Sequence, residues 1–389
     1  MKIFGQLDRQ RDWSEEENIL IHQVQRVADN ILAPNAAEYD RSSEFPWPNI
    51  KALNDLGLNA IFVPEEYGGA PMRFRLYLEL VSIISEACAS TGIIYATNFH
   101  ALKGLIDIDG AGALKARVLP RVAEGALASL AITEPSAGSD ATGMKTRFTP
   151  DGDDIIVDGG KCFITSGDVA DYIFLFGKWS QIEGARESIT ALLLETDVAG
   201  FEVVRAEDKL GTRASSTVTL AFNSCRVPRA NLVGAPGQGL QVLFSTLNKS
   251  RPSVAAHARG IARAAFRDMV AYMNEREQSR HKIIDFQGNQ FMLADLACEL
   301  AMVENWIDYV AGLFEAGVED VGLEASIAKL RASDLAMRMA TDAVQMHGGY
   351  GYCTDFRVER LMRDAKITQI WEGTNQVHRQ LIGRSFRTG

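Results

Sequence analysis

The stretch DDIIVDGGKCFITSG, residues 153–167, decides the fold class of this chain. Short runs of β-branched and aromatic residues, interrupted by Gly159–Gly160, are typical of β-strands. Four similar runs follow: DYIFLFGKW (171–179), SITALLLET (188–196), GFEVVRA (200–206) and STVTLAF (216–222). No helical segments alternate with these strands, which argues against a Rossmann sheet. We therefore predict an antiparallel sheet of roughly one hundred residues.

Helical patterns lie on both sides of this sheet region. Ser14 and Glu17 fit a capping box, apolar residues follow at helical spacing, and Pro34 is expected near the end of that helix. The apolar run at 76–90 predicts a buried helix. After the strands, helices are predicted at 238–278, 287–316 and 320–347, with a last one after Thr374. The order is therefore helices, strands, helices.

Composition excludes several classes of function. The chain has 389 residues, is 47% hydrophobic and carries a net charge of −10, so neither nucleic acid nor an anionic membrane is expected as a partner. Residues 1–30 contain no apolar core of an export signal. The five cysteines are scattered without a CxxC motif, which favours free thiols and a cytoplasmic location. The six histidines form no HExxH motif, so no metal site is expected.

Three segments have features of ligand-binding loops. AITEPSAGSDATG (131–143) offers hydroxyl and backbone N–H groups to a polar ligand, or is a turn-rich linker. Phe163 and Thr165 share one face of a strand and either bracket a flat heteroaromatic ring or belong to a half-buried strand. The glycines of QMHGGYGY (345–352) allow close approach to a phosphate or form a helix C-cap. Local pattern alone leaves each pair of interpretations open.

Charged residues in helical surroundings are equally ambiguous. Arg251 and Arg276 have the features of solvated or paired arginines as well as of ligand-binding ones. Glu372 directly follows Trp371. An acid at a helix N-terminus is stabilised by about 0.3–1 kcal/mol, which would explain a carboxylate here but not the bulky Trp371 before it. Glu372 is therefore either a helix-start charge or a base in a dry pocket.

Taken together, the motifs resemble the acyl-CoA dehydrogenase family over residues 14–386. The resemblance is carried by AITEPSAGSD (131–140), GKCFITSG (160–167), EDKLGTRASST (207–217), CRVPRANLVG (225–234), QMHGGYGY (345–352), RLMRDAKITQIWEGTNQVHR (360–379) and LIGR (381–384). It implies an α+β fold with an N-terminal helical domain (1–130), a central antiparallel β domain (131–235) and a C-terminal four-helix bundle (236–389). It also implies an acyl-CoA substrate, FAD held between the β domain and the bundle, a homotetramer whose subunits complete each other's cofactor sites, and electron-transfer flavoprotein as the electron acceptor.

The resemblance also implies roles for individual residues. Glu372 becomes the catalytic base that removes the α-proton of the thioester, with Trp371 as a wall of its pocket. The residues implied to contact the flavin are Thr133, Ser139, Phe163 (where many members have Trp), Thr165, Thr374 and Gln376. Those implied to reach the FAD diphosphate and adenosine across a subunit contact are Arg276, Gln345 and Gly349. Those implied to lie near the acyl-CoA are Arg251 and Ser139.

The chain departs from the family pattern at several positions. Ser279 and Arg280 replace the aromatic residue and glycine of the common R-x-x-F-G run, which affects the expected adenine packing. Asn248 replaces a common Asp, with consequences for contacts to the thioester carrier. Ile94 stands where glutaryl-type members bring an arginine, which argues against a substrate with a distal carboxylate.

The substrate and the fate of the electrons stay open at this stage. Arg73 and Arg75 are either surface charges or select a polar acyl tail. Alternative functions on the same fold are an oxygen-using oxidase or monooxygenase-like enzyme and a dehydrogenase acting on an acyl-carrier-protein thioester. A non-catalytic helical binding protein is the alternative from another functional class.

Overall fold

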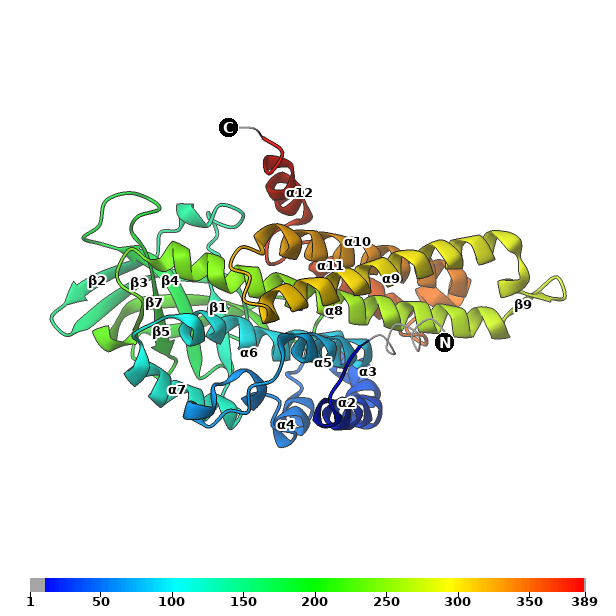
Figure 1. The fold of residues 1–389 in the computed structure, drawn as a ribbon, viewed down its shortest axis with the longest axis horizontal. Coiled ribbons are helices and arrows are strands. Elements are labelled where there is room, and N and C mark those ends of the chain that lie inside the picture. Colours follow the sequence, from blue (N-terminus) through cyan, green and yellow to red (C-terminus); the bar gives the residue numbers. More distant parts are fainter. Residues whose placement is uncertain (1–10, 388–389) are drawn as a thin grey trace.

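A computed structural model describes residues 11–387 of the chain. The predicted order of helices, sheet and helices is confirmed, and the sheet lies at one end of an elongated molecule (Figure 1). The long helices α8 (Gly239–Glu275), α9 (Gln287–Glu315) and α10 (Gly322–His347) run away from it, with the N-terminal helices along their side (Figure 1). The expectation about an export signal falls partly on residues 1–10, which lie outside the described residues.

The N-terminal helices begin with the predicted capping box. Ser14 Oγ accepts a hydrogen bond from Glu17 N at 3.2 Å, and Glu17 Oε2 accepts one from Ser14 N at 2.8 Å. Helix α2 (Glu15–Val27) continues through a π-turn, Ala28–Leu32, into α3 (Ala33–Ser42). The prediction that Pro34 marks a helix end is wrong, because Pro34 lies in the first turn of α3, where its missing N–H is not needed.

The remaining N-terminal helices are α4 (Trp47–Asp55), α5 (Phe74–Ala87), α6 (Ala89–Asp107) and α7 (Gly112–Ala123). Among them, α5 packs on the C-terminal helices, and α6 contacts both the sheet and α8. The buried helix predicted at 76–90 is interrupted at Cys88, whose extended backbone (φ −151°) separates α5 from α6. Residues of α6 and α7 pack with Phe174 and Phe176 of the sheet into one apolar core. Helix α6 is thereby fixed between the sheet and the long helices.

The central sheet has the strand order β6-β7-β3-β2-β4-β5-β8, and β1 also pairs with β4. It is mostly antiparallel, as predicted, but the β1–β4 and β2–β4 pairs are parallel. The strands are β1 (Ala128–Ala131), β2 (Arg147–Asp151), β3 (Asp154–Thr165), β4 (Tyr172–Trp179), β5 (Ile189–Glu195), β6 (Phe201–Ala206), β7 (Thr217–Pro228) and β8 (Leu232–Val233). A second apolar core lies within the sheet domain and includes Phe148, Val157 and Leu192.

The C-terminal helices include one that the sequence pattern did not predict. Helix α11 (Val358–Thr368) packs on α8 and α10, and a short turn joins it to α12 (Asn375–Arg384). Helix α12 projects away from the rest of the chain (Figure 1). A hairpin of β9 (Glu277–Gln278) and β10 (His281–Lys282) lies at the end of α8 that is far from the sheet (Figure 1). Within residues 11–387 no helix has both the length and the apolar character needed to cross a bilayer.

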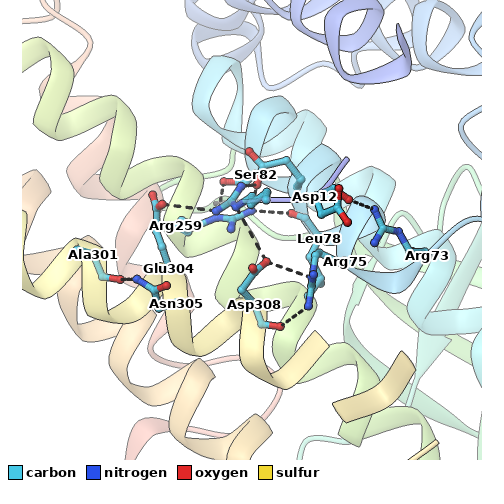
Figure 2. A network of polar contacts seen from close by, with 12 residues as sticks. Asp12, Arg73, Arg75, Leu78, Ser82, Arg259, Ala301, Glu304, Asn305 and Asp308 are labelled. Atoms are coloured by element: carbon cyan, nitrogen blue, oxygen red, sulfur yellow. Dashed lines mark hydrogen bonds and ion pairs between the residues drawn. The ribbon is translucent and has the colours of Figure 1, made fainter. Parts of the chain in front are cut away.

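Buried ionic contacts join the N-terminal helices to the C-terminal ones (Figure 2). Arg259 of α8 donates to Ser82 Oγ at 2.9 Å and to Glu79 Oε2 at 2.7 Å, both on α5. Glu304 of α9 accepts from Arg263 Nε at 2.5 Å, and Arg11 contacts both Glu79 and Glu304. We call Arg11, Glu79, Arg259, Arg263 and Glu304 the ionic cluster. It ties the segment before α2 to α5, α8 and α9.

Candidate active site

A cavity of about 620 Å³ opens where the three parts of the chain meet. Helix α6 contributes Ile93, Thr97 and His100 to its wall. The sheet domain contributes the 131–143 segment, the end of β3 and residues 207–217, and the turn between α11 and α12 closes the third side. Seven of the residues implicated from the sequence line this one cavity: Thr133, Ser139, Phe163, Thr165, Trp371, Glu372 and Thr374.

Phe163 forms an apolar wall of the cavity. The register of β3 with β7 shifts between Lys161 and Ile164, and Phe163 adopts a left-handed φ of 58° in this irregular stretch. Its side chain is 63% exposed, although its neighbours Cys162 and Ile164 are buried. Thr165, two residues on, lines the same cavity. The strand therefore presents a flat aromatic face and a hydroxyl to one space.

A buried ion pair fixes the 131–143 segment beside this strand. Lys161 Nζ donates to Glu134 Oε1 and to the Ile132 carbonyl, each at 2.8 Å, and Glu134 Oε1 also accepts from Thr146 N at 2.9 Å. Burial lowers the pKa of Lys161 to about 8. Burial alone would raise the pKa of Glu134, but Lys161 and Thr146 outweigh it and lower that pKa. The pair holds the loop in place so that Thr133 and Ser139 face the cavity.

Glu372 lies in the turn between α11 and α12. Its φ is 52°, Gly373 has a φ of 94°, and Thr374 caps α12 by accepting a hydrogen bond from Val377 N at 3.3 Å. These two left-handed residues reverse the chain so that the carboxylate faces inward while α12 leaves outward. Ser250 Oγ of α8 donates to Glu372 Oε2 at 2.6 Å. Ser250 was not predicted as a site residue, although it directly precedes Arg251.

Burial raises the pKa of the Glu372 carboxyl above its ordinary value. The hydrogen bond from Ser250 and the positive charges of Arg251 and Lys329 oppose this effect but do not cancel it. Lys329 of α10 is fully buried and donates to the Gly373 carbonyl at 2.7 Å and to Asn375 Oδ1 at 2.9 Å. Burial lowers the pKa of Lys329 to about 7. The site therefore contains a carboxylate that is more basic than usual and is bonded from α8, in a turn that Lys329 of α10 holds through the Gly373 carbonyl.

Backbone conformation also distinguishes this cavity. Phe163, Thr212 and Glu372 line it with left-handed φ values of 58°, 45° and 52°. Such conformations cost about 1–3 kcal/mol each for residues with side chains and concentrate at functional sites. Buried Asp364 of α11 accepts a hydrogen bond from Thr212 N at 2.5 Å, and burial raises the pKa of Asp364 to about 6. Contacts between the sheet domain and α11 thus hold the strained wall in place.

The other predicted cofactor residues lie elsewhere. Arg276, Gln345 and Gly349 line a second cavity of about 630 Å³, beside β9 and near the end of the long helices that is far from the sheet. The Arg276 guanidinium lies over the Tyr350 ring, 6.0 Å from its centroid. The predicted cofactor contacts thus form two separate groups within one chain.

Several residues singled out from the sequence line neither cavity. Gln376 is exposed on α12. Arg251 is buried near Glu372, and its Nε atom has no hydrogen-bond partner among the described residues. Ile94 packs into the core of the sheet domain, so its side chain does not contact the cavity in which the acyl tail would lie. The residues that do not line a cavity also include Arg73, Arg75, Asn248, Ser279 and Arg280.

The positions of these charged and turn residues have structural explanations. Arg73 Nε donates to Glu17 Oε1 at 2.7 Å. Arg75 Nε lies 3.5 Å from Asp308 Oδ1 (Figure 2). Both arginines therefore link helices rather than select an acyl tail. Ser279 and Arg280 have left-handed φ values of 51° and 69° and form the turn of the β9–β10 hairpin.

Polar atoms in the first cavity fit a large, flat and polar ligand. Ser215 Oγ and Trp371 Nε1 belong to lining residues and are buried without a hydrogen-bond partner among residues 11–387. Unpaired buried donors of this kind cost free energy until a ligand or water satisfies them. With the exposed ring of Phe163 and the hydroxyl of Thr165, they fit the flavin that the family resemblance implies.

Comparison with known proteins gives matches over most of the chain. Residues 14–126, 129–225 and 237–386 match the N-terminal, middle and C-terminal domains of acyl-CoA dehydrogenase, respectively. A probable acyl-CoA dehydrogenase of Mycobacterium leprae is 41% identical over 96% of this chain and 95% of its own length.

Two solved structures are similarly close. The butyryl-CoA dehydrogenase of Megasphaera elsdenii superimposes with a TM-score of 0.93 at 33% identity, covering 96% of this chain and 99% of its own. A chain from work on the electron transferring flavoprotein of Acidaminococcus fermentans and flavin-based electron bifurcation also gives a TM-score of 0.93. It is 37% identical and covers 97% of this chain and 99% of its own.

Proposed function

The chain belongs to the acyl-CoA dehydrogenase family, and on that premise we propose that it is an FAD-dependent enzyme that converts an acyl-CoA into the trans-2-enoyl-CoA. The observation that supports this proposal most directly is the Glu372 carboxylate. It is half-buried, accepts a hydrogen bond from Ser250 and lies in the same cavity as Phe163 and Thr165. A helix-start charge would need neither the burial nor the hydrogen bond from another helix.

Glu372 acts as the general base in this proposal. The α-proton of a thioester is only weakly acidic, so the base must be strong enough to remove it near neutral pH. The raised pKa of Glu372, caused by burial, supplies that strength. The carboxylate takes the α-proton, the C–H electron pair becomes part of the new double bond, and a hydride leaves the β-carbon. When bound, FAD would accept this hydride.

The cofactor is proposed to lie across two chains. Phe163, Thr165 and Thr133 would hold the flavin ring, whereas Arg276, Gln345 and Gly349 would hold the diphosphate and adenosine of another subunit's cofactor. The separation of these groups into two cavities within one chain supports this arrangement. The homotetramer implied by the family resemblance would provide it. Gln376, on the projecting helix α12, is proposed to contact the cofactor in that assembly.

The electron acceptor, the substrate contact and the compartment are proposed from the similar structures and from the positions of charged and cysteine residues. The similarity to a chain from work on an electron transferring flavoprotein supports that kind of protein as electron acceptor. Arg251, buried beside Glu372, is proposed to act near the acyl-CoA through its charge. The five cysteines are free thiols, which supports a reducing compartment such as the cytoplasm.

Anaerobic bleaching of the bound flavin by acyl-CoAs tests the proposal. The protein should be yellow and should bleach with at least one member of an acyl-CoA series. The variant Glu372→Gln should keep its flavin and lose bleaching by more than about 10²-fold, because the amide cannot accept the proton. Glu372→Asp, which keeps a carboxylate but shortens it, should still bleach at a reduced rate. Wild-type bleaching by Glu372→Gln would exclude Glu372 as the base.

The same preparation separates the alternative reactions. Rapid reoxidation in air with release of hydrogen peroxide would indicate an oxidase. Bleaching only by an acyl-carrier-protein thioester would indicate that carrier instead of CoA. Colourless protein that takes up no FAD would indicate a non-catalytic binding protein.

A further inference from the structure

His100 is a buried polar residue in the cavity wall that the proposed reaction does not use. It lies on α6 and is only 3% exposed, yet its Nε2 atom has no hydrogen-bond partner among the described residues. The ring contacts Phe99 edge-on, with 6.2 Å between centroids, which satisfies neither nitrogen. A buried imidazole without a partner is unfavourable unless a ligand or water completes its hydrogen bonds.

The neighbours of His100 place it on the cavity-facing stripe of α6. Ile93, Thr97 and His100 follow at helical spacing and line the cavity together. Two polar residues nearby contact the backbone, although His257 Nδ1 has no partner among the described residues. Asn98 bonds the backbone of Ala126 and Ala128 at 3.3 and 2.7 Å, and His257 Nε2 lies 2.9 Å from the Ala89 carbonyl. His100 Nε2, like Ser215 Oγ and Trp371 Nε1, is a buried polar atom of the cavity lining without a hydrogen-bond partner among residues 11–387.

The chemistry of the cavity wall differs from one contributing element to another. Glu372 and Thr165 stand where the reacting carbons and the flavin are proposed to meet, and α6 forms another side of the same cavity. A purely aliphatic acyl chain would need only apolar residues such as Ile93 along that side. Thr97 and His100 instead offer a hydroxyl and an imidazole one helical turn apart.

We propose that His100, with Thr97 beside it, recognises an uncharged oxygen function, such as a keto or hydroxyl group, on the acyl chain beyond the β-carbon. This inference rests on the proposed function and deepens it by naming a class of substrate. The substrate would be an oxygenated acyl-CoA rather than a plain fatty acyl-CoA. A site built to hydrogen-bond a substrate group discriminates strongly against the analogue that lacks it, because its own polar atoms are then left unpaired.

The protonation state of His100 favours an uncharged group on the substrate over a carboxylate. Burial lowers the pKa of His100 to about 3, so the ring is neutral at physiological pH and can donate one hydrogen bond and accept another. Buried His257 lies near enough to disfavour a second positive charge. A distal carboxylate would therefore be buried beside a neutral ring, without a compensating charge from it.

Substrate pairs that differ in one oxygen atom test the inference. A straight-chain series, from butyryl-CoA upward, first gives the preferred chain length by flavin bleaching. Derivatives of that length, each with one keto group at a successive position from the γ-carbon onward, are then compared with the plain chain. Binding is measured by calorimetry to the Glu372→Gln holoenzyme, which is expected not to turn over, and kcat/KM is measured with the wild type. At least one keto derivative should bind about five- to tenfold more tightly than the plain chain.

Variants of the cavity wall assign the effect to His100. His100→Leu should bring the keto-to-plain ratio close to one, whereas His100→Gln, which keeps a donor and an acceptor, should retain most of the preference. Ile93→Val is the matched control, because it changes cavity size on the same stripe without changing polarity. Flavin content and thermal midpoint establish that each variant is folded.

The outcomes separate the inference from the proposed reaction. A keto-to-plain ratio near one in the wild-type background, or a preference unchanged in His100→Leu, would overturn the role of His100 even if plain acyl-CoAs bleach the flavin. Tighter binding of an ω-carboxylate than of any keto derivative would overturn the choice of an uncharged group. Absence of bleaching by every acyl-CoA would instead count against the proposed dehydrogenation, while the calorimetric ratio would still decide the recognition by His100.

Discussion

Ser250 is expected to set the pH range in which Glu372 works. Only the ionised carboxylate can accept the α-proton, so bleaching should accelerate as pH rises through the pKa of Glu372. Ser250 Oγ donates to that ionised form at 2.6 Å and lowers its pKa. The Ser250→Ala variant should therefore have a higher Glu372 pKa, and the acid limb of its bleaching rate should move to higher pH. Stopped-flow bleaching over a pH series measures the shift.

A conservative variant separates this electrostatic effect from general damage. Ser250→Thr keeps the hydroxyl and should keep the wild-type profile. A loss of rate in Ser250→Ala that is the same at every pH would argue for misplacement of Glu372 instead. A profile of Ser250→Ala that coincides with that of the wild type would show that the hydrogen bond does not tune the base.

At the scale of single residues, the sequence predicted which residues line the cavity better than it predicted which groups tune them. The implied contacts Thr133, Phe163, Thr165 and Glu372 do share one cavity, because the family motifs place them together. The groups that tune Glu372 were not predicted, because Ser250 and Lys329 come from distant helices with no motif of their own. A serine or a lysine in a helix is usually solvated, so only tertiary packing distinguishes these two.

The capping box at the start of α2 gives a prediction at the scale of one element. Ser14→Ala removes the acceptor for Glu17 N and should lower the free energy of unfolding by about 1 kcal/mol. Glu17 would keep its bond from Arg73, 2.7 Å from Nε to Oε1, so the loss should not exceed the value of one cap. Denaturant unfolding followed by circular dichroism measures it. Ser14→Asp, which keeps an acceptor, should be close to wild type, and equal loss in both variants would contradict the cap.

Elements with a strong local period were predicted well, and those fixed by tertiary contacts were not. The strands from 153 to 222 and the long helices α8, α9 and α10 agree with the pattern of apolar residues. Helix α11 was not predicted, and it carries polar residues such as Arg363 and Asp364, which bond Asp40 and Thr212 across the domain boundary. The π-turn before Pro34 was also not predicted, because a proline in helical sequence ordinarily indicates an end.

At the scale of the whole molecule, the ionic cluster should contribute strongly to stability. Glu79 accepts from Arg259 at 2.7 Å and from Arg263 at 3.2 Å, with its side chain 7% exposed. Glu79→Gln leaves buried guanidinium groups without this charge and should lower the free energy of unfolding by about 3–5 kcal/mol at neutral pH. Glu38→Gln is the control, because the Glu38–Arg41 pair is exposed and should contribute at most about 1 kcal/mol.

The pH dependence of this loss has a definite sign. Burial would raise the pKa of Glu79, but Arg259, Arg11 and Arg263 outweigh it and hold the pKa below the ordinary value of 4.5. The stabilisation is therefore present above that value and is lost as pH falls through the lowered folded-state pKa. Urea unfolding of wild type and Glu79→Gln should differ most at neutral pH and converge in strong acid. A difference that grows in acid would contradict the assignment.

The two cavities of one chain lead to a prediction about the assembly. If Arg276 serves the cofactor of a neighbour, then Arg276→Ala and Glu372→Gln damage different parts of a shared site. Each variant alone should be nearly inactive, the first through loss of flavin and the second through loss of the base. The two variants are then unfolded, mixed and refolded with FAD. Random pairing makes about half of the subunit pairs mixed, and each mixed pair has one intact site of two. The mixture should therefore recover up to about a quarter of wild-type activity.

The control for this experiment is a mixture in which no intact site can form. Mixing Glu372→Gln with the double variant Arg276→Ala/Glu372→Gln should restore nothing, because every subunit lacks the base. Flavin content measured alongside activity shows whether recovery follows cofactor binding. If the first mixture stays inactive although mixed assemblies form, Arg276 and Glu372 must serve the cofactor of the same chain. The two cavities of one chain would then have to come together within that chain, without a second subunit. The complementation result therefore decides whether the folded chain carries a complete site or half of a shared one.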